Sequence, residues 1–132
     1  MRAASLLSLA LLSAGAGAQE GHHHHGVPRP PGAPEPVFIA STAKPFAGLM
    51  DDAMAVMDEG MKRAPMNGQA DHDFVTMMIP HHQGAVDMAK AVLLYTTDPE
   101  IRNLALGIIA EQQNEINLMQ AWLKRHAARE KK

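Results

Sequence analysis

The chain of 132 residues has no cysteine, only five aromatic residues and a formal net charge of −2. Without cysteine, disulfide bonds, a thiol nucleophile and cysteine-ligated zinc or iron–sulfur sites are excluded. With so few aromatic side chains and no basic excess, the sequence lacks the stacking platforms and clustered basic face that nucleic-acid binding needs. This length allows a single domain. Methionine and histidine are abundant instead, with ten and eight residues.

The first 18 residues have the pattern of a secretory signal peptide. Arg2 supplies a positive start, residues 3–14 are apolar, and the segment ends in small residues. The apolar run is too short to span a bilayer, and an uncleaved anchor is the alternative. We therefore expect cleavage after Ala18, export to the periplasm or outside the cell, and no stable membrane span in the mature chain.

Residues 19–43 are expected to form a flexible linker. Its five prolines, interspersed with glycine, are incompatible with a helix or a central strand. It also contains a run of four histidines, for which two interpretations stay open: loose capture of metal by imidazole groups, or a solvated polar spacer. This tract consists of His22, His23, His24 and His25.

From residue 44 onward hydrophobic residues recur with a helical period, and no alternating strand pattern is present. We predict one all-α domain over 44–132, a small antiparallel bundle of three long helices around one core. The helices are expected at about 45–63, 72–96 and 99–129, with Thr42, Asp71 and Asp98 as N-caps. Pro80 should kink or loosen the second helix. A further helical layer could come from a second copy of the chain.

The second helix combines methionine and histidine on the side expected to face the core. Met77, His81 and Met88 stand at i, i+4 and i+11, and Met78 and His82 form a flanking pair at i and i+4. Thioether sulfur is a soft ligand that selects Cu(I) or Ag(I) over zinc and iron, and imidazole accepts either oxidation state of copper. The polar residues of this helix are expected on its other side: Thr76, Gln83, Asp87 and Lys90.

The other two helices supply secondary candidates. On the third helix, Gln112 lies in an apolar stripe, where an unpaired buried amide is costly, so a hydrogen-bond partner or a metal is expected. Glu115 could bind metal or pair with a histidine, and Met119 could complete the site. The first helix contributes four methionines that are equally consistent with core packing, since methionine fills irregular gaps: Met50, Met54, Met57 and Met61.

Other metal and hydrolase classes lack their sequence patterns. A ferritin-type di-iron site uses Glu-x-x-His pairs from facing helices, and none occurs in the helical region. The His-Glu-x-x-His motif of zinc proteases is absent. Ser41 is the only serine outside the predicted signal peptide, which makes a serine hydrolase a poor fit.

The segment 73–89, with its core Met77-Met78-Ile79-Pro80-His81-His82 followed by Met88, resembles the signature of the bacterial DUF 305 family, and residues 98–123 are similar to that family's second half. The family contains exported copper-binding metallochaperones. The resemblance implies a ferritin-like helical bundle and a copper-binding role. The resemblance implies this copper-binding role for seven of the candidate residues above: His81, His82, Met77, Met78, Met88, Met119 and Gln112.

These patterns together predict an exported, non-enzymatic protein that binds Cu(I), with Ag(I) or Cu(II) as further metals. It would act as a metallochaperone or sequestering protein in copper tolerance, with a copper exporter or a cuproprotein as acceptor. The second hypothesis is a structural or partner-binding helical homo-oligomer without tight metal binding. The third is a metal-dependent oxidase, which oxygen uptake with Cu(I) would reveal.

Overall fold

The computed structural model describes residues 32–127, whose regular secondary structure consists of three α-helices. The helices are α1 (Phe46–Lys62), α2 (Ala70–Tyr95) and α3 (Pro99–Ala127). The prediction of an all-α, antiparallel, three-helix domain is therefore confirmed for this part of the chain. The predicted signal peptide, the tract His22–His25 and residues 128–132 lie outside the described residues.

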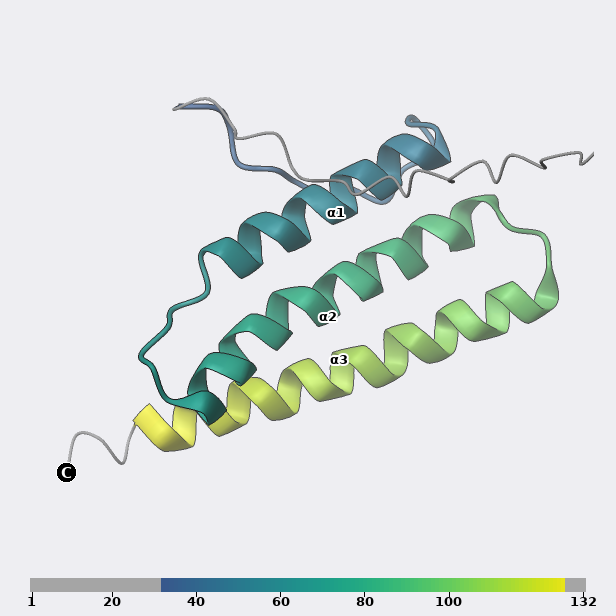
Figure 1. Ribbon diagram of the computed structural model, residues 1–132. Coiled ribbons are helices and arrows are strands. Elements are labelled where there is room, and N and C mark those ends of the chain that lie inside the picture. The colour runs from purple at the N-terminus through teal and green to yellow at the C-terminus, as the bar shows by residue number, and fades with distance from the viewer. Residues whose placement is uncertain (1–31, 128–132) are drawn as a thin grey trace, which may run out of the picture.

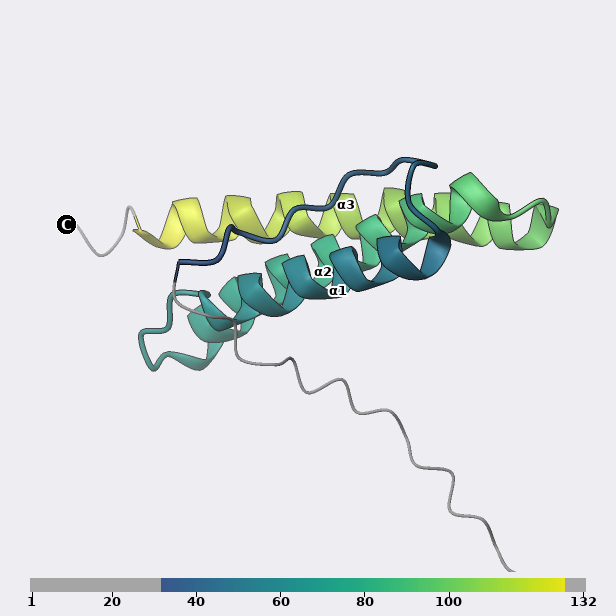
Figure 2. The same ribbon diagram turned by 90° about the horizontal axis from the view of Figure 1, so that it is seen from above.

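The three helices lie side by side as one layer with α2 in the middle (Figure 1). α2 packs along α1 on one flank and along α3 on the other, whereas the backbones of α1 and α3 do not approach each other. In the view from above, α1 lies over α2 and α3 runs beside them (Figure 2). A layer one helix thick has two broad faces, and each must be covered or remain exposed.

The core between the helices is small. Its buried apolar side chains are Leu49, Ala53, Val75, Val86, Ala89, Ala91, Ala105 and Ile116. Two glycines let α1 and α2 approach closely, because a Cβ atom on Gly60 would lie 2.6 Å from Pro80 Cβ and one on Gly84 would lie 2.8 Å from Met57 Cβ. α2 continues through Pro80 as one helix, so the proline packs against α1 without dividing α2.

The start of α2 differs from the prediction. The helix begins at Ala70, and Asp71 is therefore not its N-cap. Asp73 binds the preceding turn instead, where its carboxylate accepts hydrogen bonds from the backbone N–H groups of Asn67 at 2.8 Å and Gly68 at 3.0 Å. These hydrogen bonds lower the pKa of Asp73 below its usual 3.8. Gly68 has φ +82°, a conformation that favours glycine.

Of the predicted N-caps of α1 and α3, the first is wrong and the second is correct. Thr42 does not cap α1, because the residue before the helix is Pro45 and no side chain binds the first turn. Asp98 caps α3 as predicted: its Oδ1 accepts hydrogen bonds from the backbone N–H groups of Glu100 at 2.8 Å and Ile101 at 3.4 Å.

Residues 32–45 have no helix or strand and are attached near both ends of α1. Glu35 Oε2 accepts a hydrogen bond from Arg63 Nη1 at 2.7 Å, and Lys44 Nζ pairs with Asp52 at 2.6 Å. The Tyr95 hydroxyl donates a hydrogen bond to the Lys44 carbonyl. This segment, dark blue in Figure 2, therefore lies along α1 and ties it to the end of α2.

Candidate metal-binding face

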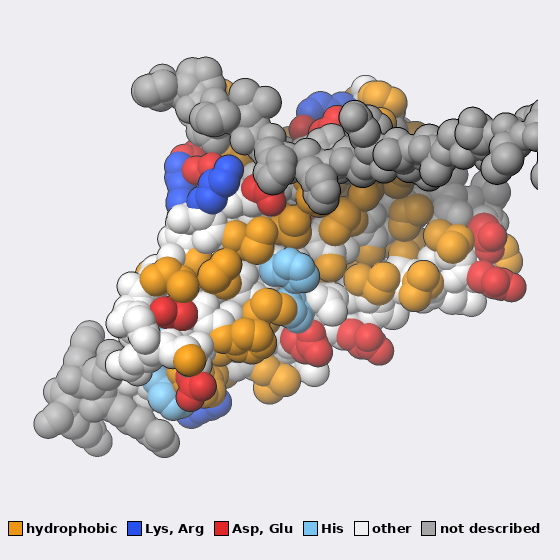
Figure 3. All heavy atoms as spheres, viewed as in Figure 1, with side chains coloured by type: hydrophobic (Ala, Val, Ile, Leu, Met, Phe, Trp, Pro, Cys, Tyr) orange, Lys and Arg blue, Asp and Glu red, His pale blue; other side chains and the backbone are white. Residues whose placement is uncertain are grey.

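Helical spacing places the side chains of the layer on two faces, because residues at i, i+4, i+7 and i+11 of a helix share one side. A pocket of ≈ 250 Å³ joins Met88 of α2 to Leu104 and Ile108 of α3 and fixes their common face. We call this surface, which Figure 3 shows, the open face. It is made by Met50, Met54, Met57 and Met61 of α1, Met77, His81 and Met88 of α2, and Leu104, Ile108, Glu111 and Glu115 of α3.

The predicted stripe of α2 lies in the middle of the open face and is not buried in a core. Met77 is 38% exposed and His81 is exposed, while Met88 is half-buried. The prediction that this stripe faces the core is wrong because α1 and α3 occupy the two flanks of α2 and leave the stripe uncovered between them. Figure 3 shows histidine side chains at the centre of a largely hydrophobic surface, with Lys and Arg only at its margins.

The predicted polar side of α2 is only partly exposed, because Lys90 is exposed and Gln83 is half-buried, whereas the other two residues are buried. Thr76 and Asp87 are only 6% and 5% exposed. Asp87 accepts a hydrogen bond from Gln83 Nε2 at 2.9 Å and lies 3.8 Å from Lys90 Nζ. Burial raises the pKa of Asp87 above its usual 3.8.

His82 connects α2 to α3 through both of its ring nitrogens. Nδ1 lies 2.8 Å from the Met78 carbonyl oxygen and Nε2 lies 2.7 Å from Glu115 Oε2. With a proton on each nitrogen, the ring donates both hydrogen bonds and pairs with the Glu115 carboxylate. Glu115 thus pairs with a histidine, one of the two roles open to it. His82 can ligate a metal only after one of these contacts is released.

His81 is in a different situation from its neighbour. Its ring centroid lies 5.9 Å from that of His82 in an edge-on arrangement. Within residues 32–127 its ring nitrogens make no hydrogen bond or ion pair, and the side chain is exposed. Of the two predicted histidine ligands, His81 is therefore the one whose nitrogens are available without any rearrangement.

The methionines of α1 lie beside this stripe. All four are half-buried, and the side chain of Met57 lies directly against Gly84 of α2. Because Met50, Met54 and Met61 are in helical register with Met57, the row borders the α2 stripe along the open face. The structure thus brings thioether groups of α1 to the same surface as Met77 and His81.

The remaining candidates on α3 are Gln112 and Met119, which are both half-buried. Among the described residues, no side-chain nitrogen or oxygen is buried without a hydrogen-bond partner. The amide of Gln112 therefore requires no metal to satisfy it. Nor do any three His, Asp or Glu side chains of residues 32–127 cluster as a metal site would require. A site on this face would have to depend on thioether sulfur.

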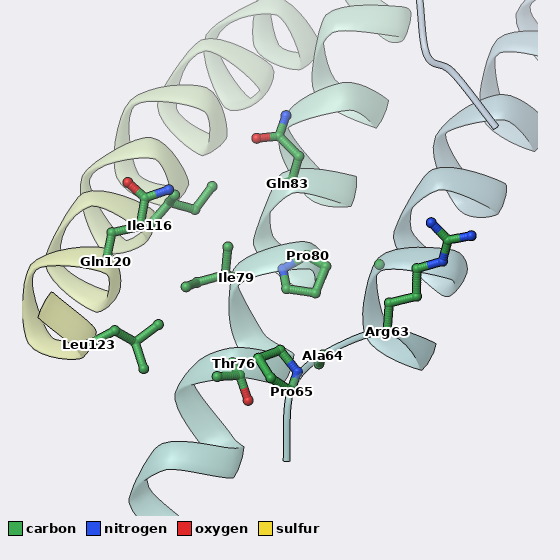
Figure 4. A pocket seen from close by; sticks show the side chains of 11 residues that line it. Arg63, Ala64, Pro65, Thr76, Ile79, Pro80, Gln83, Ile116, Gln120 and Leu123 are labelled. Carbon is green, nitrogen blue, oxygen red and sulfur yellow. The ribbon is translucent and has the colours of Figure 1, made fainter. Parts of the chain in front are cut away.

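A second hollow lies on the opposite side of the layer and was not found from the sequence. This groove of ≈ 390 Å³ runs between α1 and α3 across α2. Its lining is mostly apolar, and Ile79 and Ile116 lie on its α2 and α3 walls (Figure 4). The polar residues of the lining are Arg63, Thr76, Gln83 and Gln120. The groove contains none of the predicted metal ligands.

None of the three helices of residues 32–127 has the length and hydropathy needed to cross a membrane.

Two comparisons with known proteins bear on this chain. Residues 71–132, which include α2 and α3, match the model of a family described as "Domain of unknown function (DUF305)". The chain is also 47% identical over 53 residues to an uncharacterized protein, L153, of Acanthamoeba polyphaga mimivirus. That match covers 40% of this chain and 35% of the viral protein, so the chain spans about a third of its relative's length.

Proposed function

We propose that this protein, whose residues 71–132 form a DUF305 domain, is an exported, non-enzymatic protein that binds Cu(I), or Ag(I), as cargo on the open face, and that it carries or sequesters copper. The family's description assigns no activity, so the proposal is argued from the side chains of the chain itself. Export depends on the signal peptide expected at residues 1–18, which lie outside the described part of the chain.

One observation supports this proposal above all: neutral thioether groups from two helices border an exposed imidazole on one face. Met57 lies against Gly84, and Met77 is 38% exposed beside the exposed His81. Soft neutral sulfur favours Cu(I) and Ag(I), whereas hard carboxylate ligands would favour other metals. Thioethers also cannot form disulfides, which suits a metal carrier in an oxidising compartment.

The two histidines contribute differently to this proposal. His81 would be the primary nitrogen ligand, since its nitrogens have no other partner in the described chain. His82 is held by Met78 and Glu115 and would fix the helix that presents His81. This division narrows the predicted ligand set to one that begins with His81 and Met77, which are one helical turn apart, with Met88 and the α1 methionines as further donors along the face.

Competition titrations with a chromophoric Cu(I) chelator test the proposal. The full chain, expressed with its own N-terminus, is compared with His81→Ala and with a double Met77→Leu, Met88→Leu variant. Each variant should lower Cu(I) affinity at least tenfold. Met66→Leu is the matched control, because Met66 is an exposed methionine of the α1–α2 loop and does not belong to the open face.

The outcomes separate this site from the histidine tract. A chain in which His22–His25 are replaced by serine should keep its tight binding. Loss of binding with that tract alone, or equal affinity of the wild type and His81→Ala, would refute the assignment to the open face. Oxygen uptake during aerobic incubation with Cu(I) would refute the non-enzymatic part of the proposal.

A further inference from the structure

We infer that the open face is the contact surface of a two-fold symmetric dimer of this chain, and that the cargo metal lies between the two copies. The position of the metal between the copies rests on the proposed function, whereas the contact between the copies rests on packing alone.

Within one copy, the apolar side chains of the open face remain uncovered. Of the eight buried apolar residues of the described chain, four are alanines, so little hydrophobic surface is buried within one copy. Large apolar side chains remain exposed on the open face, with Leu104 at 60% and Met77 at 38%. Helical layers bury such a surface against a second layer. Within residues 32–127 no further helix is present to provide one.

The composition of the open face also resembles that of a protein interface. Its side chains are mainly methionine and aliphatic residues, and Lys and Arg appear only at its margins (Figure 3). The cores of protein interfaces are enriched in methionine and depleted in lysine in the same way. Two such faces can meet without burying Lys or Arg, and the acidic residues of the face, Glu111 and Glu115, are exposed on the flanking helix α3, away from its middle helix. A second copy is therefore a suitable occupant.

The area of the open face is sufficient for a stable contact between two copies. A helix of 26 residues such as α2 is about 39 Å long. Three helices with axes about 9 Å apart present a face on the order of 1,000 Å². A standard stable interface buries about 800 Å² on each partner. One copy of the same face is therefore large enough to form a stable dimer.

The position of α2 then places the metal ligands. α2 is the middle helix of the layer, so a two-fold contact of the whole face sets the two α2 helices opposite each other. Met77 and His81 of one copy then face the same residues of the other. Among residues 32–127, a single copy offers only one histidine with unoccupied nitrogens on this face, because His82 is paired with Glu115. The second copy doubles the donor set.

Sedimentation equilibrium of the full chain, expressed with its own N-terminus, tests the contact. Leu104→Glu places a charge on the open face, whereas Leu106→Glu is a matched control: Leu106 is 53% exposed and shares a side of α3 with Gln120 of the groove. The wild type and Leu106→Glu should be dimers, and Leu104→Glu should raise the dimer dissociation constant at least tenfold. Far-UV circular dichroism of both variants verifies that the helices remain formed.

Ag(I) titration of the same samples tests the shared site. Leu104→Glu removes no metal ligand, yet it should lower Ag(I) affinity about tenfold if both copies contribute donors, while Leu106→Glu should not. A wild type that is monomeric with and without Ag(I) would overturn the inference, as would equal effects of the two leucine variants. A monomer that becomes dimeric when His22–His25 are replaced by serine would also overturn it and assign the face to the chain's own N-terminal residues.

The two proposals fail in different ways. A dimer that binds no Ag(I) would refute the proposed function and keep the contact between copies. A monomer that binds Ag(I) with an affinity unchanged in Leu104→Glu would refute the contact and keep the proposed function.

Discussion

Alanine at Gly84 tests the close approach of α1 and α2 that brings methionines beside His81. A Cβ atom at this position would lie 2.7 Å from Met57 Sδ and 2.8 Å from Met57 Cβ. Because Met57 Cβ is bonded directly to the backbone of α1, rotation of the side chain cannot relieve the second contact. Either the helices separate or the backbone around Met57 shifts.

The expected magnitude follows from two opposing effects. Replacing glycine by alanine inside a helix stabilises the helix by about 1 kcal/mol through propensity. Overpacking a close contact costs about 1–3 kcal/mol. Gly84→Ala should therefore destabilise the domain by about 1 kcal/mol, which for a domain of this size lowers the Tm by about 4–8 °C. Gly60→Ala should have the same sign, because its Cβ would lie 2.6 Å from the rigid ring of Pro80.

Gly107 of α3 is the matched control. A Cβ atom there would meet nothing within 4 Å, so Gly107→Ala should stabilise the domain by about 1 kcal/mol through propensity alone. Urea unfolding followed by far-UV circular dichroism measures all three variants. Stabilisation of Gly84→Ala and Gly60→Ala to the same extent as Gly107→Ala would show that α1 does not pack closely on α2. The α1 methionines would then not border the α2 stripe, and Gly84→Ala should leave the Cu(I) affinity unchanged.

Three further predictions concern titratable side chains and are measured by urea unfolding. His82→Ala should cost about 1 kcal/mol because the contacts of the ring with the Met78 carbonyl and Glu115 are lost, whereas His81→Ala, at an exposed position, should cost less than about 0.5 kcal/mol; equal losses would contradict the linking role of His82. Asp87→Asn should stabilise the domain at pH 7, since a pKa raised by burial makes the ionised form costly above the unfolded value of 3.8; a gain that does not shrink as the pH falls toward that value would argue against this. Asp73→Asn should destabilise at neutral pH and lose its effect as the pH falls through the lowered folded pKa, and an effect that persists in acid would disprove the role of that carboxylate.

Much of the secondary structure could be predicted from the sequence. The three helices begin and end within about two residues of the expected positions wherever the structure describes them, because their hydrophobic period is strong. The Asp98-Pro99 start of α3 combines a cap with a favourable first residue and was unambiguous. Asp71 and Asp73 were harder to distinguish, since both are acidic residues near a helix start, and the choice depends on the turn formed by Asn67 and Gly68.

The burial of each helix face could not be predicted in the same way. Periodicity identifies an apolar stripe but not the neighbour that covers it, and α2 has neighbours on both flanks. The polar Asp87 is therefore buried against α1, while the apolar stripe containing Met77 is exposed. The pairing of His82 with Glu115 depends on how α2 and α3 are aligned along their axes. The spacing of residues within one helix gives no information about that alignment.

The adjacency of His81 and His82 gives one turn of α2 two separate functions. Neighbouring residues on an α-helix point about 100° apart, so one ring can face α3 while the other faces outward. His82 binds Glu115 and holds α2 in position, and His81 remains exposed beside Met77. Under the proposed function, such donors become accessible to an acceptor when the two copies separate, without opening of a helical core, which would suit delivery better than long-term storage. In the proposed dimer, an acceptor presenting a similar soft-ligand face would compete with the second copy, so metal transfer and dissociation of the dimer should occur together.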